Sequence, residues 1–88
     1  MMTQDEGGYY LLCIPTETEV RQLSFDSVDA IHHWLLNSWD EYHEWLHETT
    51  HEVVQLDSLW IEFADEDGTR YRDAMVVIDP DTGRLEIN

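Results

Sequence analysis

The longest regular pattern in the chain spans residues 26–53, where apolar residues recur every three or four positions. At about 100° per residue, this spacing is typical of an amphipathic helix. One stripe gathers the apolar residues Val28, Ile31, Leu35, Trp39, Tyr42, Leu46 and Val53, and the opposite side gathers the acidic residues Asp29, Asp40, Glu41, Glu44, Glu48 and Glu52. We therefore expect one side of this helix to form the core of a small domain and the other to present carboxylates to solvent.

Two capping signals leave the number of helices in this segment open. Asp26 and Ser27 are both suitable N-caps at its start, and Ser38 stands three residues before Glu41 in a second capping-box spacing. No proline interrupts the run. The pattern predicts either one helix bent near Asn37 or two short helices, with the same apolar side in both cases.

Apolar runs and apolar–polar alternation on both sides of the helical segment predict strands. These cover residues 9–15, 19–25, 56–64, 70–79 and 84–88, and turn-forming glycine, proline or aspartate separates the later ones. The order β-β-α(α)-β-β-β predicts an α+β fold in which an antiparallel sheet of about five strands carries a long or broken helix on one face. We expect a single domain over residues 1–88, with residues 1–8 as a flexible leader.

The charge of the chain narrows the classes of partner. Four arginines, no lysine and 20 acidic residues give a formal net charge of −16 at pH 7. A surface this negative repels nucleic acid and anionic membranes and attracts basic surfaces. The aromatic and aliphatic content is too high for a disordered acidic tail, so a folded domain should carry the charge. The sequence does not decide whether the protein is a monomer or a homodimer.

The sequence also bears on the compartment. No basic segment precedes an apolar run at the N-terminus, and no stretch approaches the roughly 18 apolar residues of a membrane span. Cys13 is the only cysteine and lies in an apolar run, so we expect a buried, unreactive thiol and no intrachain disulfide. These features favour a cytoplasmic protein. If the gene is carried by a phage, the compartment would be the cytoplasm of the infected host cell.

One short motif suggests catalysis. The stretch HEWLH, with His43, Glu44 and His47, matches the H-E-x-x-H pattern in which two histidines on one helix face bind zinc and the glutamate acts as base. The match is short in a chain rich in His and Glu, and no third ligand is evident. A small zinc metallohydrolase is therefore the alternative hypothesis, and the main expectation is no metal, no cofactor and no enzyme activity.

The acidic side of the helix suggests binding. Asp40, Glu44, Glu48 and Glu52 recur every four residues, a rise of about 6 Å per step. Alternate phosphates of a DNA strand are separated by about 7 Å along the axis, so the spacing is compatible with phosphate mimicry. The predicted partner-binding surface consists of these residues with Glu41 and Trp45, widened by the turn carboxylates Asp65, Glu66 and Asp67.

In charge and predicted architecture, the chain broadly resembles two groups of small acidic α+β proteins. One comprises phage-encoded DNA mimics, including inhibitors of uracil glycosylase, restriction and CRISPR systems, and the other comprises immunity proteins that neutralise nuclease toxins. This resemblance implies an inhibitor that binds a basic, nucleic-acid-binding protein without binding nucleic acid itself. A further alternative is an acidic module without a specific target, adapted to solubility or to high salt.

Overall fold

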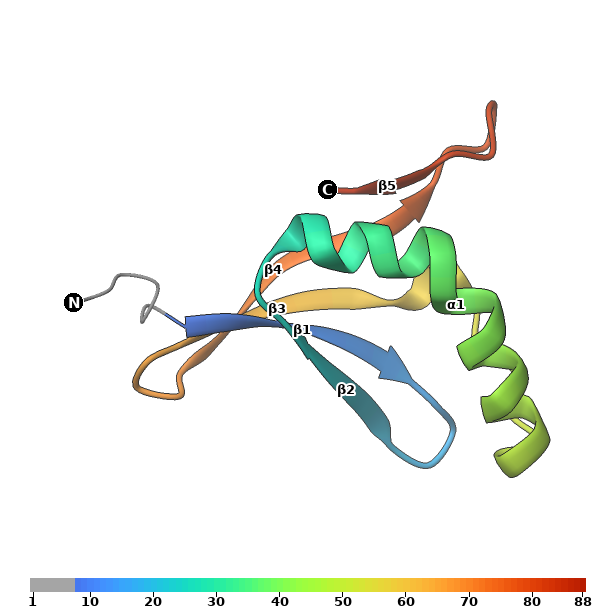
Figure 1. The fold of residues 1–88 in the computed structure, drawn as a ribbon, viewed down its shortest axis with the longest axis horizontal. Coiled ribbons are helices and arrows are strands. Elements are labelled where there is room, and N and C mark those ends of the chain that lie inside the picture. Colours follow the sequence, from blue (N-terminus) through green and yellow to red (C-terminus); the bar gives the residue numbers. More distant parts are fainter. Residues whose placement is uncertain (1–7) are drawn as a thin grey trace.

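A computed structural model describes residues 8–88 of the chain. Along the sequence, its elements are β1 (Gly8–Pro15), β2 (Val20–Phe25), α1 (Val28–Thr50), the short 3-10 helix η2 (Leu56–Ser58), β3 (Trp60–Asp65), β4 (Arg70–Ile78) and β5 (Leu85–Ile87) (Figure 1). The predicted α+β class and element order are confirmed. The third strand is shorter than predicted, because residues 56–58 form a 3-10 turn before the chain enters the sheet.

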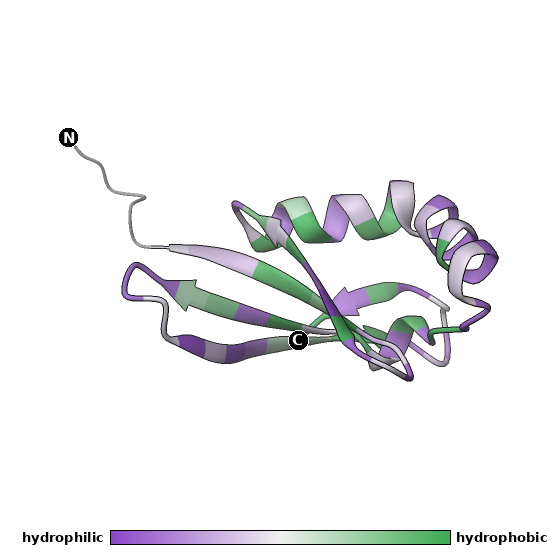
Figure 2. Ribbon diagram, turned by 90° about the horizontal axis from the view of Figure 1, so that it is seen from below, coloured by the Kyte–Doolittle hydropathy of each residue, from purple (hydrophilic) through white to green (hydrophobic). Residues whose placement is uncertain are grey.

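The five strands form one antiparallel sheet in the order β2-β1-β3-β4-β5. The last three strands are a meander, and the first hairpin extends the same sheet because β1 pairs with β3. Figure 2 shows two layers, with α1 over one face of the sheet. Between β3 and β4 the register shifts at Ile61 and Glu62, so that Asp73 is an extra residue in β4.

The start of β1 corrects one boundary. The predicted leader covered residues 1–8, and residues 1–7 lie outside the described part of the chain. Gly8 is the first residue of β1 and lies opposite Asp65. Its φ is 130°, and a Cβ atom at this position would collide with the carbonyl oxygen of Ala64. The strand can begin here because glycine permits both this backbone conformation and this close approach.

Helix α1 is continuous, so the choice between one bent helix and two helices is resolved in favour of one. The Ser27 side chain caps its start by accepting a hydrogen bond from the backbone N–H of Ala30 at 3.1 Å. Figure 1 shows a bend near the middle of the helix. In this region the side-chain amide of Asn37 donates to the carbonyl oxygen of His33 at 2.8 Å, a type of insertion that accompanies helix bending.

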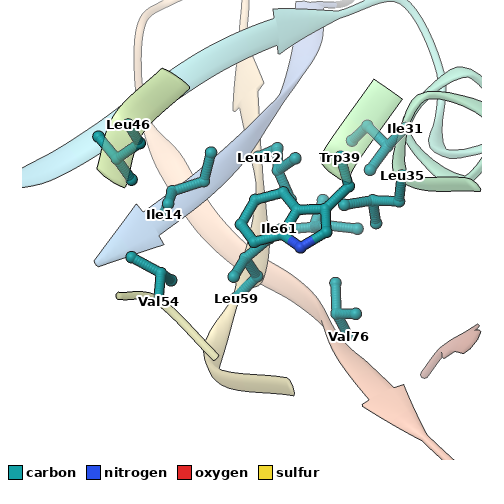
Figure 3. Packing of buried hydrophobic residues seen from close by; sticks show 10 residues of the cluster. All are labelled: Leu12, Ile14, Ile31, Leu35, Trp39, Leu46, Val54, Leu59, Ile61 and Val76. Carbon is teal, nitrogen blue, oxygen red and sulfur yellow. The ribbon is translucent and has the colours of Figure 1, made fainter. Parts of the chain in front are cut away.

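The core lies between α1 and the covered face of the sheet (Figure 3). Leu35 and Leu46 pack there with residues of β3 and β4, as the apolar stripe predicts. The buried cluster is made up of Leu12, Ile14, Ile31, Leu35, Trp39, Leu46, Val54, Leu59, Ile61 and Val76. Tyr42 is half-buried at its border, and the ring of Phe63 lies against that of Tyr10, with ring centroids 5.1 Å apart.

The end of the helix corrects the predicted stripe at Val53. His51 adopts a left-handed conformation with a φ of 63° and ends α1 after Thr50. The helical phase is lost at that point, so Val53 is 65% exposed and Val54 is buried in its place.

Candidate protein-binding surface

The predicted carboxylate row is present along the C-terminal half of α1. Asp40, Glu44 and Glu48 are all exposed and follow one another at one-turn intervals, about 6 Å of rise per step. Glu41 is exposed beside them. Because they project from a helix whose opposite side is fixed in the core by Trp39 and Leu46, the backbone that carries these carboxylates is rigid.

Glu52 does not continue the row. It lies beyond the end of α1 and is half-buried, and its carboxylate accepts a hydrogen bond from the backbone N–H of Glu17 in the β1–β2 turn. This contact fixes the turn beside the end of the helix. It also brings in two exposed carboxylates, Glu17 and Glu19, that we did not assign to the surface from the sequence.

The elements that carry these side chains, the C-terminal half of α1 and the β1–β2 turn, meet at one end of the molecule (Figure 1). We call this surface the acidic end and define it as Glu17, Glu19, Asp40, Glu41, Glu44, Glu48 and Glu52. Arg21 is the basic residue that the described contacts place here, and its Nε atom lies 3.5 Å from a carboxylate oxygen of Glu19. The acidic end therefore keeps a large excess of negative charge.

The turn carboxylates Asp65, Glu66 and Asp67 do not widen this surface. They form the β3–β4 turn, which Figure 1 places at the other end of the long axis from the C-terminal half of α1. The Asp65 carboxylate is committed to the turn, since it accepts hydrogen bonds from the backbone N–H groups of Asp67 and Thr69 at 3.0 Å each. Glu66 and Asp67 are exposed, but the turn that carries them lies at the opposite end of the molecule from the C-terminal half of α1.

Trp45 borders the acidic end and is 47% exposed. Its ring lies 5.7 Å from that of Tyr42, and the guanidinium carbon of Arg21 stands 5.4 Å from its centroid. Trp34, by contrast, is half-buried among Phe25, Trp39 and Tyr42. Trp45 is thus an aromatic side chain available to a partner, already stacked with a cation.

The two histidines of the HEWLH stretch lie in different environments. His43 is half-buried, its ring stacks on Trp39 with centroids 5.4 Å apart, and its Nε2 atom accepts a hydrogen bond from the backbone N–H of Val54 at 3.1 Å. His47 is exposed, and its ring neighbours that of His51 at 6.4 Å. Within residues 8–88, no cluster of three or more His, Cys, Asp or Glu side chains has the geometry to hold a metal ion.

Cys13 lies on the face of the sheet opposite α1, where it is fully buried beside Leu11 and Trp60. Burial and the negative charge of nearby Glu62 raise the pKa of the Cys13 thiol to about 11. The expected buried thiol is therefore present.

A hollow that we did not predict separates α1 from the β4–β5 hairpin. It has a volume of about 340 Å³, with Leu35, Trp39, Leu56 and Ile78 among its apolar lining residues and with Asp40 and Arg84 among the polar ones. Leu36 also lines it and is 61% exposed. The one signal in the sequence is Leu36 itself, a leucine beside the apolar stripe rather than on it.

No protein-family model, curated protein or solved structure matches the chain. In the part that the structure describes, no helix combines the length and apolar character needed to cross a membrane. Function must therefore be inferred from the surfaces and side chains described above.

Proposed function

We propose that this protein is a non-enzymatic inhibitor that binds a basic, nucleic-acid-binding surface of another protein. The observation that carries the proposal is the acidic end, in which three carboxylates at one-turn spacing on α1 combine with those of the β1–β2 turn. Carboxylates held on a rigid scaffold are suited to a groove that evolved for phosphates, and strong opposite charge speeds association. The expected targets are a nuclease, a restriction complex or a CRISPR effector, encountered in the cytoplasm.

The metallohydrolase alternative is less well supported by the contacts of its residues. Zinc binding through the Nε2 atom of His43 would break the hydrogen bond from the backbone N–H of Val54. Without His43 the motif supplies one zinc ligand, His47, because Glu44 acts as the base, and a catalytic zinc site needs three protein ligands.

Matched charge reversals test the proposal. The target would first be captured from a lysate of the native host, and its affinity would then be measured for the wild type and for a variant carrying Asp40→Lys, Glu44→Lys and Glu48→Lys. A control variant carrying Glu66→Lys, Asp67→Lys and Asp73→Lys changes the net charge equally at exposed sites around the β3–β4 turn.

We expect the helix variant to lose several kcal/mol of binding free energy, because close charge pairs across an interface each couple by about 1.5 kcal/mol or more. The control variant should lose far less, binding of the wild type should weaken as salt rises, and DNA should compete for the target. Equal losses in the two variants would mean that only total charge matters. Affinity that ignores both salt and the helix reversals would refute the proposal.

A further inference from the structure

The hollow beside Leu36 belongs to a longer groove. A second hollow of about 420 Å³ shares His32, Arg84 and Leu85 with the first and continues along β5 to Asn88. Together they follow the N-terminal half of α1 on one side and the β4–β5 hairpin on the other. We call this the α1–β5 groove; in Figure 1, β5 lies beside that half of the helix. The lining of the first hollow is mainly apolar and that of the second is mainly polar.

The strand on the hairpin side of the groove is an edge strand. Met75 exchanges two backbone hydrogen bonds with Asn88 at 3.0 Å each, and the backbone N–H of Asp79 donates to the carbonyl oxygen of Arg84 at 2.9 Å. In an antiparallel ladder the direction of these groups alternates, so the backbone N–H and C=O groups of Leu85 and Ile87 point away from β4. The carbonyl oxygen of Leu85 already lies within hydrogen-bonding distance of His32, so a further strand would share this oxygen with His32 or displace the ring, and the other outward groups are available to it.

His32 connects this edge to α1. Its Nε2 atom lies 3.3 Å from the carbonyl oxygen of Leu85, so the ring donates a weak hydrogen bond to one of the outward groups. The edge of β5 and the wall of the helix are therefore within the reach of one side chain. An extended peptide that followed this edge would have the apolar hollow within reach of its side chains, which alternate in direction along a strand.

The charge of the α1–β5 groove indicates which kind of partner it favours. Asp29, Asp40 and Glu86 line the groove, against Arg84 as the cation among the lining residues. A second copy of this chain would bring a further net charge of −16 to the contact, which opposes self-association. A basic segment is attracted both by the local carboxylates and by the whole molecule.

We propose that the α1–β5 groove binds an extended, basic segment of a partner polypeptide, which pairs with the edge of β5 and inserts an apolar side chain next to Leu36. This goes beyond the proposed inhibitor function and does not require it, since the groove and the acidic end share only Asp40. Backbone pairing would supply affinity, and the hollow would select the side chain at one position.

A synthetic peptide tests this inference directly. The probe is a capped heptapeptide that alternates lysine with valine and has leucine at its centre, titrated into the full-length protein labelled with ¹⁵N. We expect the largest amide shifts at Leu36, Leu85 and Ile87. A peptide with glutamate in place of lysine, and one with N-methylated backbone amides, should each bind at least about tenfold more weakly, because they lose the charge attraction and the strand pairing respectively.

Two variants of the protein complete the test. Leu36→Ala should weaken binding by at least about threefold, through lost apolar contact, whereas Val53→Ala, at an equally exposed site outside the groove, should leave it unchanged. Ile87→Pro removes an outward N–H that takes no part in the ladder with β4 and should weaken binding by about fivefold. If Ile87→Pro fails to fold, the N-methylated peptide gives the same information.

Three outcomes would overturn the inference. The first is that the amide shifts are confined to Asp40, Glu44 and Glu48 and that N-methylation of the peptide has no effect, which would indicate charge attraction alone. The second is that sedimentation of the protein shows a dimer whose interface is the groove. The third is that the lysine peptide does not bind. The charge-reversal experiment is a separate test, because it measures the affinity of a protein target for the acidic end and can fail whether or not the peptide enters the groove.

Discussion

The Nε2 atom of His43 accepts a hydrogen bond from the backbone N–H of Val54 at 3.1 Å. This bond joins the middle of α1 to the segment that leaves its C-terminus, and it directs Val54 into the core. Since Nε2 is the acceptor, the ring proton resides on Nδ1. A residue that the sequence places in a zinc motif therefore stabilises a chain reversal.

Replacing His43 tests this structural role. His43→Ala leaves the buried N–H of Val54 without a partner and removes the stacking on Trp39, so we expect a loss of about 1 to 3 kcal/mol in the free energy of unfolding. His47→Ala, at an exposed position, should change stability by less than about 0.5 kcal/mol. Urea unfolding measures both, and elemental analysis of the wild type should find no stoichiometric zinc. One equivalent of zinc that is lost on His43→Ala would support the hydrolase instead.

The packing of α1 on the sheet is tested at Leu46. Its side chain is fully buried next to Ile14 and Val54, so Leu46→Ala should cost about 2 to 5 kcal/mol, the usual range for a buried leucine. Val53→Ala is the control, since Val53 is 65% exposed and should contribute less than about 0.5 kcal/mol. Similar costs for the two variants would mean that the helix ends elsewhere.

Variants of Glu52 and Glu48 compare a carboxylate that stabilises the fold with one that is exposed to solvent. Glu52→Gln weakens the bond to the N–H of Glu17 by removing its charge, and we expect a loss of about 1 kcal/mol in stability with faster proteolysis of the β1–β2 turn. Glu48→Gln removes the same charge from an exposed site and should leave stability unchanged or slightly raised, because it relieves repulsion. Thermal unfolding and limited digestion with a glutamate-specific protease distinguish the two variants, because the β1–β2 turn contains Glu17 and Glu19 but no lysine or arginine. Equal behaviour of the two variants would argue against a structural role for Glu52.

The raised pKa of the Cys13 thiol predicts slow labelling of the folded protein and a dependence of its stability on pH. Burial raises its pKa from 9.0 to about 11, so at pH 8 iodoacetamide should label the folded protein about 100-fold more slowly than the urea-unfolded chain. The unfolded chain releases this proton first as pH rises. The contribution of the thiol to stability is therefore complete below about pH 9 and is lost between about pH 9 and 11. Cys13→Ala should flatten that decline, and fast labelling of the folded protein would contradict the burial.

The periodic parts of the fold could be predicted because burial on one side imposes a period on each element. The helical stripe identified Ile31, Leu35 and Leu46, and alternation over residues 56–64 correctly predicted that Leu59 and Ile61 face the core. In these elements the apolar residues that face the core follow the period of their own helix or strand, so the local pattern is sufficient to predict which side chains are buried.

The ends of elements could not be predicted in the same way. His51 ends α1 in a left-handed conformation that is more typical of glycine or asparagine, so the sequence carries no strong stop signal there. The acidic end was predicted except for Glu17 and Glu19, and these were missed for a different reason. Glu17 joins it through a contact with Glu52, 35 residues away, and local periodicity contains no information about such a distance.

The short length of β5 has a consequence for the behaviour of the protein in concentrated solution. Ladder pairing with β5 covers only the C-terminal half of β4, and among residues 8–88 no strand pairs with the outer side of residues 70–74. An open strand of this kind is a template for aggregation between copies. Here Arg70, Arg72 and the extra residue Asp73 place charge and an irregular twist on it, so an incoming strand would meet mismatched spacing and would have to bury charged groups. Two of the four arginines of this acidic chain thus stand where they hinder growth into fibrils.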